Sequence, residues 1–184
     1  NDDPVVFDSR YDMRDHGYLT EVKDQETEGN CWAFASIAAL ESCILKANGT
    51  AYDFSEENLK NIVAMFSDYG NWGASPNSGG NLFMAIGYFA SWLGPVYEKD
   101  DIYSSNALSL LYDAVTHIQN VLFIPRTSST DNDNIKEAIM KYGAVVVNMF
   151  YSDAYLSNDG ISYYLPSYNG MNHEVTIVGW DDNY

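Results

Sequence analysis

The order of the predicted elements gives an α+β fold, in which helices come first and most strands follow. Three segments with the character of helices lie in the first half of the chain, and segments rich in β-branched and aromatic residues come afterwards. This separation indicates segregated layers of helix and sheet. A chain of 184 residues can bury a core of its own and suggests one domain.

The longest apolar segment, residues 31–47, is predicted to be a buried central helix. It has no wide polar face, and a helix that is apolar all round is a buried one. Asn48 and Gly49 follow it, a pair typical of a helix end. Residues 25–30 before it are polar and contain glycine, as a loop does. Cys31 is therefore expected in the first turn of a buried helix.

Shorter helices and several strands complete the predicted order. Ser55 is a good N-cap for a helix that ends near Phe66, and residues 81–93 form an apolar helix closed by Gly94. A short helix is expected over residues 133–142, with Asp133 as its cap. The expected strands are residues 117–125, 144–151, 161–165 and 173–180.

The net charge of −17 argues against two classes of partner. Nucleic-acid phosphates and anionic membrane surfaces would both be repelled. No run of eighteen apolar residues is present, so no membrane-spanning segment is expected. The acidity could attract cationic substrates, and the alternative is solubility in a salty or extracellular setting. Cys31 and Cys43 lie about 18 Å apart along one predicted helix, too far to form a disulfide.

Cys31, at the start of a helix, is a candidate nucleophile. Unpaired N–H groups and the positive end of the helix dipole favour a thiolate there, and the same N–H groups can hold an oxyanion. Gln25, six residues earlier, can direct a side-chain amide to the same point. The alternative is a small packed thiol, the usual role of a free cysteine. The polar loop, Gln25 and the following Trp32 argue against that alternative.

A cysteine nucleophile needs a base, and the chain has three histidines. His173 stands at the start of a predicted strand, where a loop meets rigid sheet, and this position suits a catalytic group. His16 is expected to be a surface residue and His117 a structural one. Residues 131–134 lack the spacing and glycine of an EF-hand loop, so no metal site is predicted.

Taken together, these motifs resemble the papain family of cysteine peptidases, in its bacterial and archaeal branch. Residues 25–36 resemble the segment that carries the oxyanion-hole glutamine, the nucleophile and a tryptophan, and residues 172–180 resemble the histidine strand. Further matches, in the same order, are residues 55–59, 79–80 and 94–103. The family's usual disulfide near the active site is absent, since Glu28 and Asn77 stand at its two positions.

The resemblance implies a papain-like two-lobe fold within a single peptidase domain over residues 1–184. A helical N-terminal lobe with the long central helix would span about residues 21–110. A β-barrel-like C-terminal lobe would span about residues 111–184, together with an N-terminal strap that crosses to it. Cys31 would then lie on one wall of the cleft between the lobes, and His173 on the other.

The family's third catalytic residue, an asparagine after the histidine, is not reached before Tyr184. The natural domain is therefore expected to continue, and a remaining C-terminal segment or chain would complete the β lobe. The chain also begins without a methionine or a leader, so it is interpreted as a form whose targeting segment is missing. The expected location is extracellular or at the cell surface.

The activity that the resemblance implies is hydrolysis of peptide bonds in a polypeptide substrate. Cys31 would attack as a thiolate, His173 would act as its imidazolium partner, and Gln25 would help to hold the oxyanion. No metal or organic cofactor is required. Two alternatives remain open, a papain-fold binding or adhesion module without turnover and an acyl transferase that uses the same dyad.

The resemblance also predicts substrate contacts. Gly79 and Gly80 match the cleft glycines, and Trp32 and Asn172 adjoin the nucleophile and the base. Glu174 follows the histidine, at the position that lines the pocket for the second residue before the cut. A carboxylate there would select lysine or arginine through a charge-assisted contact. The alternative is that Glu174 points to solvent or pairs with a cation of its own.

Overall fold

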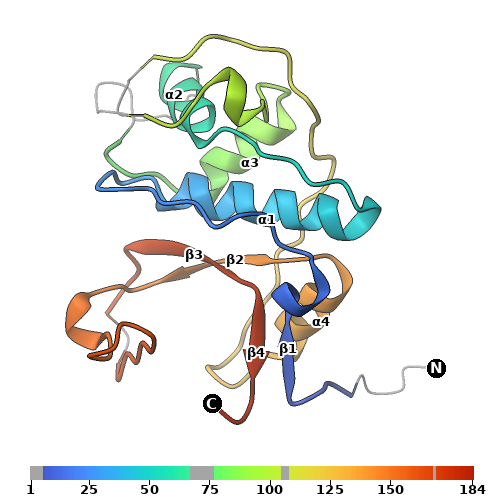
Figure 1. Cartoon of the computed structure of the whole chain (residues 1–184). Coiled ribbons are helices and arrows are strands. Elements are labelled where there is room, and N and C mark those ends of the chain that lie inside the picture. Colours follow the sequence, from blue (N-terminus) through green and yellow to red (C-terminus); the bar gives the residue numbers. More distant parts are fainter. Residues whose placement is uncertain (1–5, 67–76, 105–107, 168) are drawn as a thin grey trace.

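Helices and strands occupy separate layers in the computed structural model of the chain (Figure 1). The structure describes residues 6–66, 77–104, 108–167 and 169–184. Helices α2 and α3 lie on one side of the long helix α1, and the strands lie on its other side together with α4 (Figure 1). The predicted α+β class, with most helices before the strands, is confirmed.

The central helix α1 spans Cys31–Asn48 and begins at the predicted residue. It ends because Gly49 adopts a left-handed conformation with φ 76° and donates its N–H to the carbonyl of Leu45 at 2.8 Å. One side of α1 packs against α2 and α3, and the other packs against β2 and β3. Two polar residues of this helix, Glu41 and Ser42, are also buried, and they bond to segments outside it.

Helix α2 spans Glu56–Phe66, as its N-cap signal predicts. The Ser55 hydroxyl accepts the N–H of Asn58 at 2.9 Å, which satisfies one of the free donors of the first turn. The polar side of the helix is buried as well. Lys60 and Glu57 both lie inside the fold, where they form a 3.1 Å ion pair. Its charged residues therefore belong to the interior of the helical layer.

Helix α3 spans Leu82–Ala90 and is shorter than predicted. Asn81 caps it by accepting the N–H of Phe83 at 3.0 Å. The helix ends before Leu93, the predicted end, because Trp92 turns into a left-handed conformation with φ 62°.

The strands form two antiparallel pairs. Strand β2, Val145–Met149, pairs with β3, His173–Ile177, in a register that sets Met149 opposite His173. Strand β1, Arg10–Asp12, pairs with β4, Gly179–Asp181, so the N-terminal segment reaches the last strand of the chain. Helix α4, Asp133–Lys141, packs against β2 and β4, and its N-cap is Asn132. Short 3₁₀ turns cover Met13–His16, Glu98–Asp100 and Asp153–Tyr155.

Two of the predicted strands are wrong. Residues 117–125 form no strand, and their apolar side chains at Leu122 and Phe123 are 62% and 61% exposed. Residues 161–165 make only one bridge, between Tyr163 and Leu156, where the turn that ends at Gly160 brings the chain back beside residues 155–157. Residue composition alone could not show that both segments lack a partner strand.

A partly buried ion cluster attaches residues 18–25, called here the strap, to the helical layer. The ammonium of Lys23 donates to the carbonyl of Phe54 at 2.7 Å and contacts Asp53 at 2.8 Å and Glu56 at 3.1 Å. Burial lowers the pKa of Lys23, but the neighbouring carboxylates outweigh burial, so this pKa is raised overall. The strap is thereby fixed in place although it has no regular secondary structure.

Glu41 of α1 forms the second half of the ion cluster. Its carboxylate accepts the hydroxyl of Thr20 at 2.5 Å and the N–H of Phe54 at 2.7 Å, and it lies 3.8 Å from Lys23. Burial raises the pKa of Glu41 and raises that of Glu56 to about 8, while the charge of Lys23 acts in the opposite direction on both. Burial thus favours the protonated form of both carboxyl groups, and the charge of Lys23 favours the ionised form.

Replacing Glu56 with glutamine is predicted to change how stability depends on pH. The carboxyl group titrates near its ordinary value of 4.5 in the unfolded chain and near pH 8 in the folded chain. The folded state holds this proton more tightly between those values, so the contribution of Glu56 is complete below pH 4.5 and declines as pH rises to about 8. Glu56→Gln should remove that decline from the unfolding free energy, measured in urea at pH 5 to 8.

The matched control for this measurement is Glu137→Gln, because the side chain of Glu137 is exposed on α4. We expect the control to keep the pH slope of the wild type. Equal slopes for Glu56→Gln and the wild type would contradict the prediction.

Candidate active site

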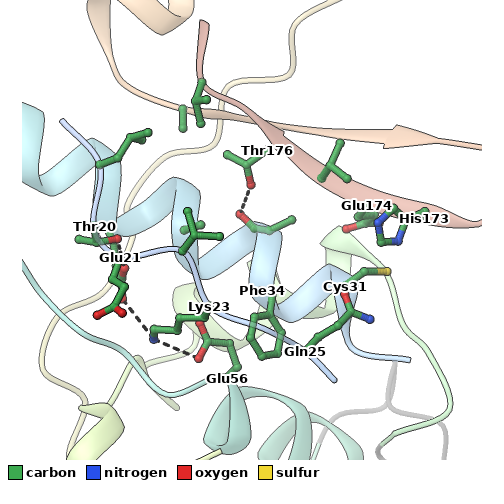
Figure 2. A pocket seen from close by; sticks show the side chains of 18 of the residues that line it. Thr20, Glu21, Lys23, Gln25, Cys31, Phe34, Glu56, His173, Glu174 and Thr176 are labelled. Atoms are coloured by element: carbon green, nitrogen blue, oxygen red, sulfur yellow. Dashed lines mark hydrogen bonds and ion pairs between the residues drawn. The ribbon is translucent and has the colours of Figure 1, made fainter. Parts of the chain in front are cut away.

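A cavity of about 410 Å³ lies among α1, β3 and the strap. Figure 2 shows that Cys31 and His173 lie at one end of it, with Glu174 and Gln25 beside them. Lys23 and Glu56 of the ion cluster lie toward the other end (Figure 2). The structure thus brings the predicted nucleophile and base, far apart in the sequence, to one cavity.

Cys31 is the first residue of α1, and its side chain is partly exposed. A residue at this position has a backbone N–H without an intrahelical acceptor, and the positive end of the helix dipole lies there. Its sulfur is directed toward the end of the cavity that holds the His173 ring (Figure 2). Cys31 and Cys43 are both free thiols, as predicted from their separation.

His173 is the first residue of β3, and its imidazole is half-buried. Burial lowers the pKa of this imidazole, because a charged ring loses hydration. The ring centroid lies 5.5 Å from that of Tyr151, with the two planes tilted by 49°. Sequence reasoning missed Tyr151, because it lies in a different segment and carries no local motif.

Asn172 supports the turn before His173. Its side-chain oxygen accepts the N–H of Tyr151 at 2.6 Å, and its side-chain nitrogen donates to the carbonyl of Tyr151 at 2.9 Å. The side chain expected to contact substrate therefore bonds the backbone of a neighbouring segment. This contact fixes the approach of the chain to β3.

Gln25 lines the cavity together with Cys31. Its side-chain nitrogen donates to the carbonyl of Glu28 at 2.7 Å, which leaves its second N–H for another acceptor. The carbonyl of Gln25 accepts the hydroxyl of Tyr103 at 2.9 Å, and that hydroxyl in turn accepts a hydrogen bond from the side-chain nitrogen of Asn30 at 3.1 Å. Tyr103 and Asn30 thus hold the loop that precedes Cys31, a role that no local sequence signal revealed.

Asn77 stands at one of the two positions of the family's usual disulfide, which the sequence predicts to be absent. It forms hydrogen bonds with the same loop, the one that precedes Cys31. Its carbonyl accepts the N–H of Gly29 at 2.9 Å, and its side-chain oxygen accepts from Asn30 at 3.3 Å. These hydrogen bonds join Gly29 and Asn30 to the segment before Gly79, so non-covalent contacts connect the two segments.

Trp32 and Gly80 are in close contact with each other. Trp32 is only 1% exposed, so its burial argues against the predicted contact with substrate. A Cβ atom at Gly80 would come within 2.4 Å of the indole, which explains the absence of a side chain there. Gly79 has φ 110° and open space around it. Among the described residues that line the cavity holding Cys31, neither Gly79 nor Gly80 is found.

Glu174 is the most buried of the predicted substrate contacts after Trp32, with 6% of its surface exposed. Its Oε1 atom accepts the N–H of Leu82 at the start of α3, at a distance of 3.1 Å. Its Oε2 atom is buried and has no hydrogen-bond partner within the described ranges. Burial raises the pKa of this carboxyl group, and the bond from Leu82 opposes the shift. The side chain thus neither points to solvent nor pairs with a described cation.

The other two histidines are outside the cavity lining. His16 is exposed and stacks between Tyr11 and Tyr18, with ring centroids 4.8 Å and 5.7 Å away. His117 stacks on Trp92 at 3.5 Å. The predicted surface position of His16 is confirmed, and the packing of His117 against an indole fits its predicted structural role.

Comparisons with known proteins agree with this arrangement. The family model described as papain family cysteine protease matches residues 7–184. Cysteine proteinase 15A of Pisum sativum is 31% identical over 178 residues, which are 92% of this chain and 47% of that protein. Cathepsin S of Bos taurus is 30% identical over 172 residues, covering 92% of this chain and 50% of that protein. The chain thus spans about half the length of these curated relatives.

Solved structures give the same result. The cysteine protease and lectin-like domains of Cwp84, a surface layer associated protein of Clostridium difficile, align with a TM-score of 0.81 at 30% identity, over 98% of this chain and 40% of that one. Digestive procathepsin L 3 of Tenebrio molitor aligns with a TM-score of 0.75 at 26% identity, over 94% of this chain and 55% of that one. The fold is therefore papain-like, as predicted. The chain belongs to the papain family of cysteine proteases.

These matches favour neither a binding module nor an acyl transferase, since the relatives named above are proteinases and cathepsins. In the described part of the chain, no helix has both the length and the apolar character that crossing a membrane requires.

Replacing Gly80 with alanine is predicted to destabilise the loop below the site. The added methyl would overlap the buried indole of Trp32, and overpacking of this kind costs about 1–3 kcal/mol. The matched control is Gly87→Ala within α3, where a Cβ meets nothing within 4 Å. This control should gain about 0.5–1 kcal/mol, because alanine favours a helix interior. Urea unfolding measures both, and equal effects would contradict the packing argument.

Proposed function

We propose that this chain is a cysteine endopeptidase, with Cys31 as the nucleophile and His173 as its acid and base. The observation that carries the proposal is the meeting of Cys31, His173 and Gln25, from three separate segments, around one cavity (Figure 2). Membership of the papain family of cysteine proteases supports the same chemistry. The substrate class is polypeptide.

The reaction begins with an ion pair between the Cys31 thiolate and the His173 imidazolium. The helix N-terminus favours the thiolate, and the thiolate favours the imidazolium in opposition to the effect of burial. The sulfur attacks the carbonyl carbon of the scissile peptide bond, and the carbonyl electrons move to oxygen. The N–H of Cys31 and the second amide proton of Gln25 then hold this oxyanion.

The acyl-enzyme forms when the oxyanion collapses and the C–N bond breaks. His173 gives its proton to the leaving amine and becomes neutral. The neutral imidazole then takes a proton from water, and the resulting hydroxide attacks the thioester carbonyl. Release of the carboxylic product leaves the sulfur as a thiolate and the imidazole protonated, so the ion pair is restored.

Single replacements within the dyad test the proposal. Cys31→Ala should abolish cleavage of a peptide substrate, and His173→Ala should lower kcat at least about 10³-fold. Gln25→Ala should lower kcat about 10²–10³-fold, because one oxyanion donor is lost. Initial rates of cleavage, followed by mass spectrometry of the products, measure these effects.

Cys43→Ala is the matched control for Cys31→Ala. Cys43 lies further along the same helix, and burial raises the pKa of its thiol. We expect this variant to cleave at the wild-type rate and Cys31 to react with iodoacetamide below neutral pH while Cys43 does not. Cleavage that survives Cys31→Ala would overturn the proposal.

The proposed function also assigns the layers of Figure 1 to two lobes of one domain over residues 1–184. The helical lobe corresponds to about residues 21–110, of which 67–76 and 105–107 lie outside the described residues. The β-rich lobe corresponds to about residues 111–184, and the pairing of β1 with β4 supports the assignment to it of the N-terminal segment that leads into the strap. We place the protein outside the cell or at its surface, and its similarity to Cwp84, a surface layer associated protein, supports that location.

Glu174 is proposed to give the peptidase a preference for a cationic side chain near the cut. Its buried Oε2 atom has no described partner, and the carboxyl group lines the cavity beside His173. A buried carboxylate oxygen without a partner is unfavourable, so an ammonium or guanidinium group of the substrate would gain by pairing with it. The preference should strengthen as pH rises, because the raised pKa keeps the group partly neutral at acidic pH.

Matched peptides that differ only in leucine, glutamine, lysine or arginine at the second residue before the cut test this preference. The wild type should cleave the lysine and arginine peptides about 10-fold or more faster in kcat/KM than the leucine peptide. Glu174→Gln keeps the size and removes the charge, and it should reduce that ratio to near one. A clear preference of the wild type for leucine would contradict the role of Glu174.

A further inference from the structure

The imidazole of His173 must face the Cys31 thiol for the proposed reaction, yet few contacts hold it in that orientation. Within the described part of the chain, no hydrogen bond reaches either of its ring nitrogens, and its one ring contact there is with Tyr151, at a centroid distance of 5.5 Å and a tilt of 49°. Aromatic pairs attract each other at 4.5–7 Å in tilted or offset arrangements, so this contact restrains the ring.

Tyr151 is itself fixed from several directions. Its backbone N–H and carbonyl both bond the side chain of Asn172, the residue before His173, at 2.6 Å and 2.9 Å. Its hydroxyl donates to Asp153 at 2.9 Å. The two hydrogen bonds with Asn172 tie the backbone of Tyr151 to the start of β3, and the hydrogen bond to Asp153 orients its ring. The tyrosine and the histidine therefore keep a constant spacing.

A second tyrosine supports the ring of Tyr151. Tyr163 stacks on it with a centroid distance of 5.7 Å and an interplanar angle of 18°, and the hydroxyl of Tyr163 donates to the carbonyl of Phe150 at 2.6 Å. Tyr164, the next residue, is 75% exposed and makes none of the ring contacts found here. The support is therefore specific to the two stacked tyrosines.

We propose that Tyr151 is a positioning residue that holds the His173 imidazole toward Cys31, an inference that rests on the proposed peptidase function. Without the tyrosine ring, the imidazole can rotate about its two side-chain torsions, and it is turned away from the sulfur for much of the time. The thiolate then loses its cationic partner, and Cys31 behaves as an ordinary thiol.

Several titratable groups surround His173 and must be considered in a pH experiment. Cys31 faces it from α1, Tyr151 with Asp153 behind it approaches from the segment after β2, and Glu174 follows it on β3. Both Tyr151→Ala and Tyr151→Phe remove the hydroxyl that donates to Asp153, so the phenylalanine variant controls for any change at that carboxylate. A change in the pH dependence of Cys31 reactivity that appears only in Tyr151→Ala would therefore report on the imidazole and not on a new charge.

The experiment compares Tyr151→Ala, Tyr151→Phe and the control Tyr164→Ala in the full-length protein. The readouts are the rate of Cys31 alkylation by iodoacetamide from pH 4 to 10 and the separate values of kcat and KM for a peptide. Tyr151→Ala should lose the reactive plateau below neutrality, and its kcat should fall about 10- to 100-fold while KM changes less than about 3-fold. Tyr151→Phe keeps the ring and should retain both, as should Tyr164→Ala.

Two results would overturn the role of Tyr151 alone. One is an alkylation profile and a kcat in Tyr151→Ala that equal those of an active wild type. The other is a loss in Tyr151→Phe as large as in Tyr151→Ala, which would assign the effect to the hydroxyl and not to the ring. A wild type without any Cys31-dependent cleavage would instead overturn the proposed function, and this inference with it.

A measurement on the wild type guards against a variant that fails to fold. Nuclear Overhauser contacts between the ring protons of Tyr151 and those of His173 are expected if the tyrosine holds the imidazole. Their absence from the folded wild-type protein would overturn the proposal.

Discussion

The packing of α1 against β3 is the constraint on which the site depends. The hydroxyl of Thr176 donates to the carbonyl of Ala35 at 3.0 Å, which fixes the register of the strand on the helix. Ala35 lies about one helical turn beyond Cys31, and Thr176 lies three residues beyond His173. The first residues of both elements are consequently brought to the same end of one cavity. Because Trp32 and Ala33 in the first turn of that helix are buried, Cys31 cannot move without disturbing the core.

The parts of the chain that lack regular structure are held to this pair by polar contacts. Lys23 attaches the strap to the helical layer, and Tyr103 fixes the backbone of Gln25. Glu174 bonds the first N–H of α3 and so joins β3 to the helices. Buried ion pairs and side-chain bonds of this kind add little net stability but specify a unique arrangement, because any displacement leaves a buried polar group unpaired. The walls of the cavity therefore depend on hydrogen bonds, with no disulfide between the described cysteines.

Sequence reasoning succeeded where the signal is local. The start of the helix at Cys31 and of the strand at His173 follow from a change of polarity and from alternation, and the cap at Ser55 follows from residue type. Sequence reasoning failed where the surroundings of a side chain are formed by segments that are distant in the sequence. The ring contact of Tyr151, the hydroxyl of Tyr103 and the burial of Trp32 all depend on which segments meet after folding. Residues 117–125 have a strand-like pattern, but no strand in the described chain lies beside them.

The charge around the cavity bears on how the proposed catalytic pair of Cys31 and His173 can form. Glu41, Glu56 and Glu174 all line it, burial raises the pKa of each, and Lys23 is a cation that pairs with the first two. In their ionised forms these carboxylates disfavour a thiolate alone and favour an imidazolium alone, which opposes the effect of burial on His173. A thiolate–imidazolium pair has no net charge, so the field of these carboxylates acts on it far less than on either ion. The two protons therefore cannot be treated separately, and whatever fixes the orientation of the imidazole also determines the ionisation of the sulfur.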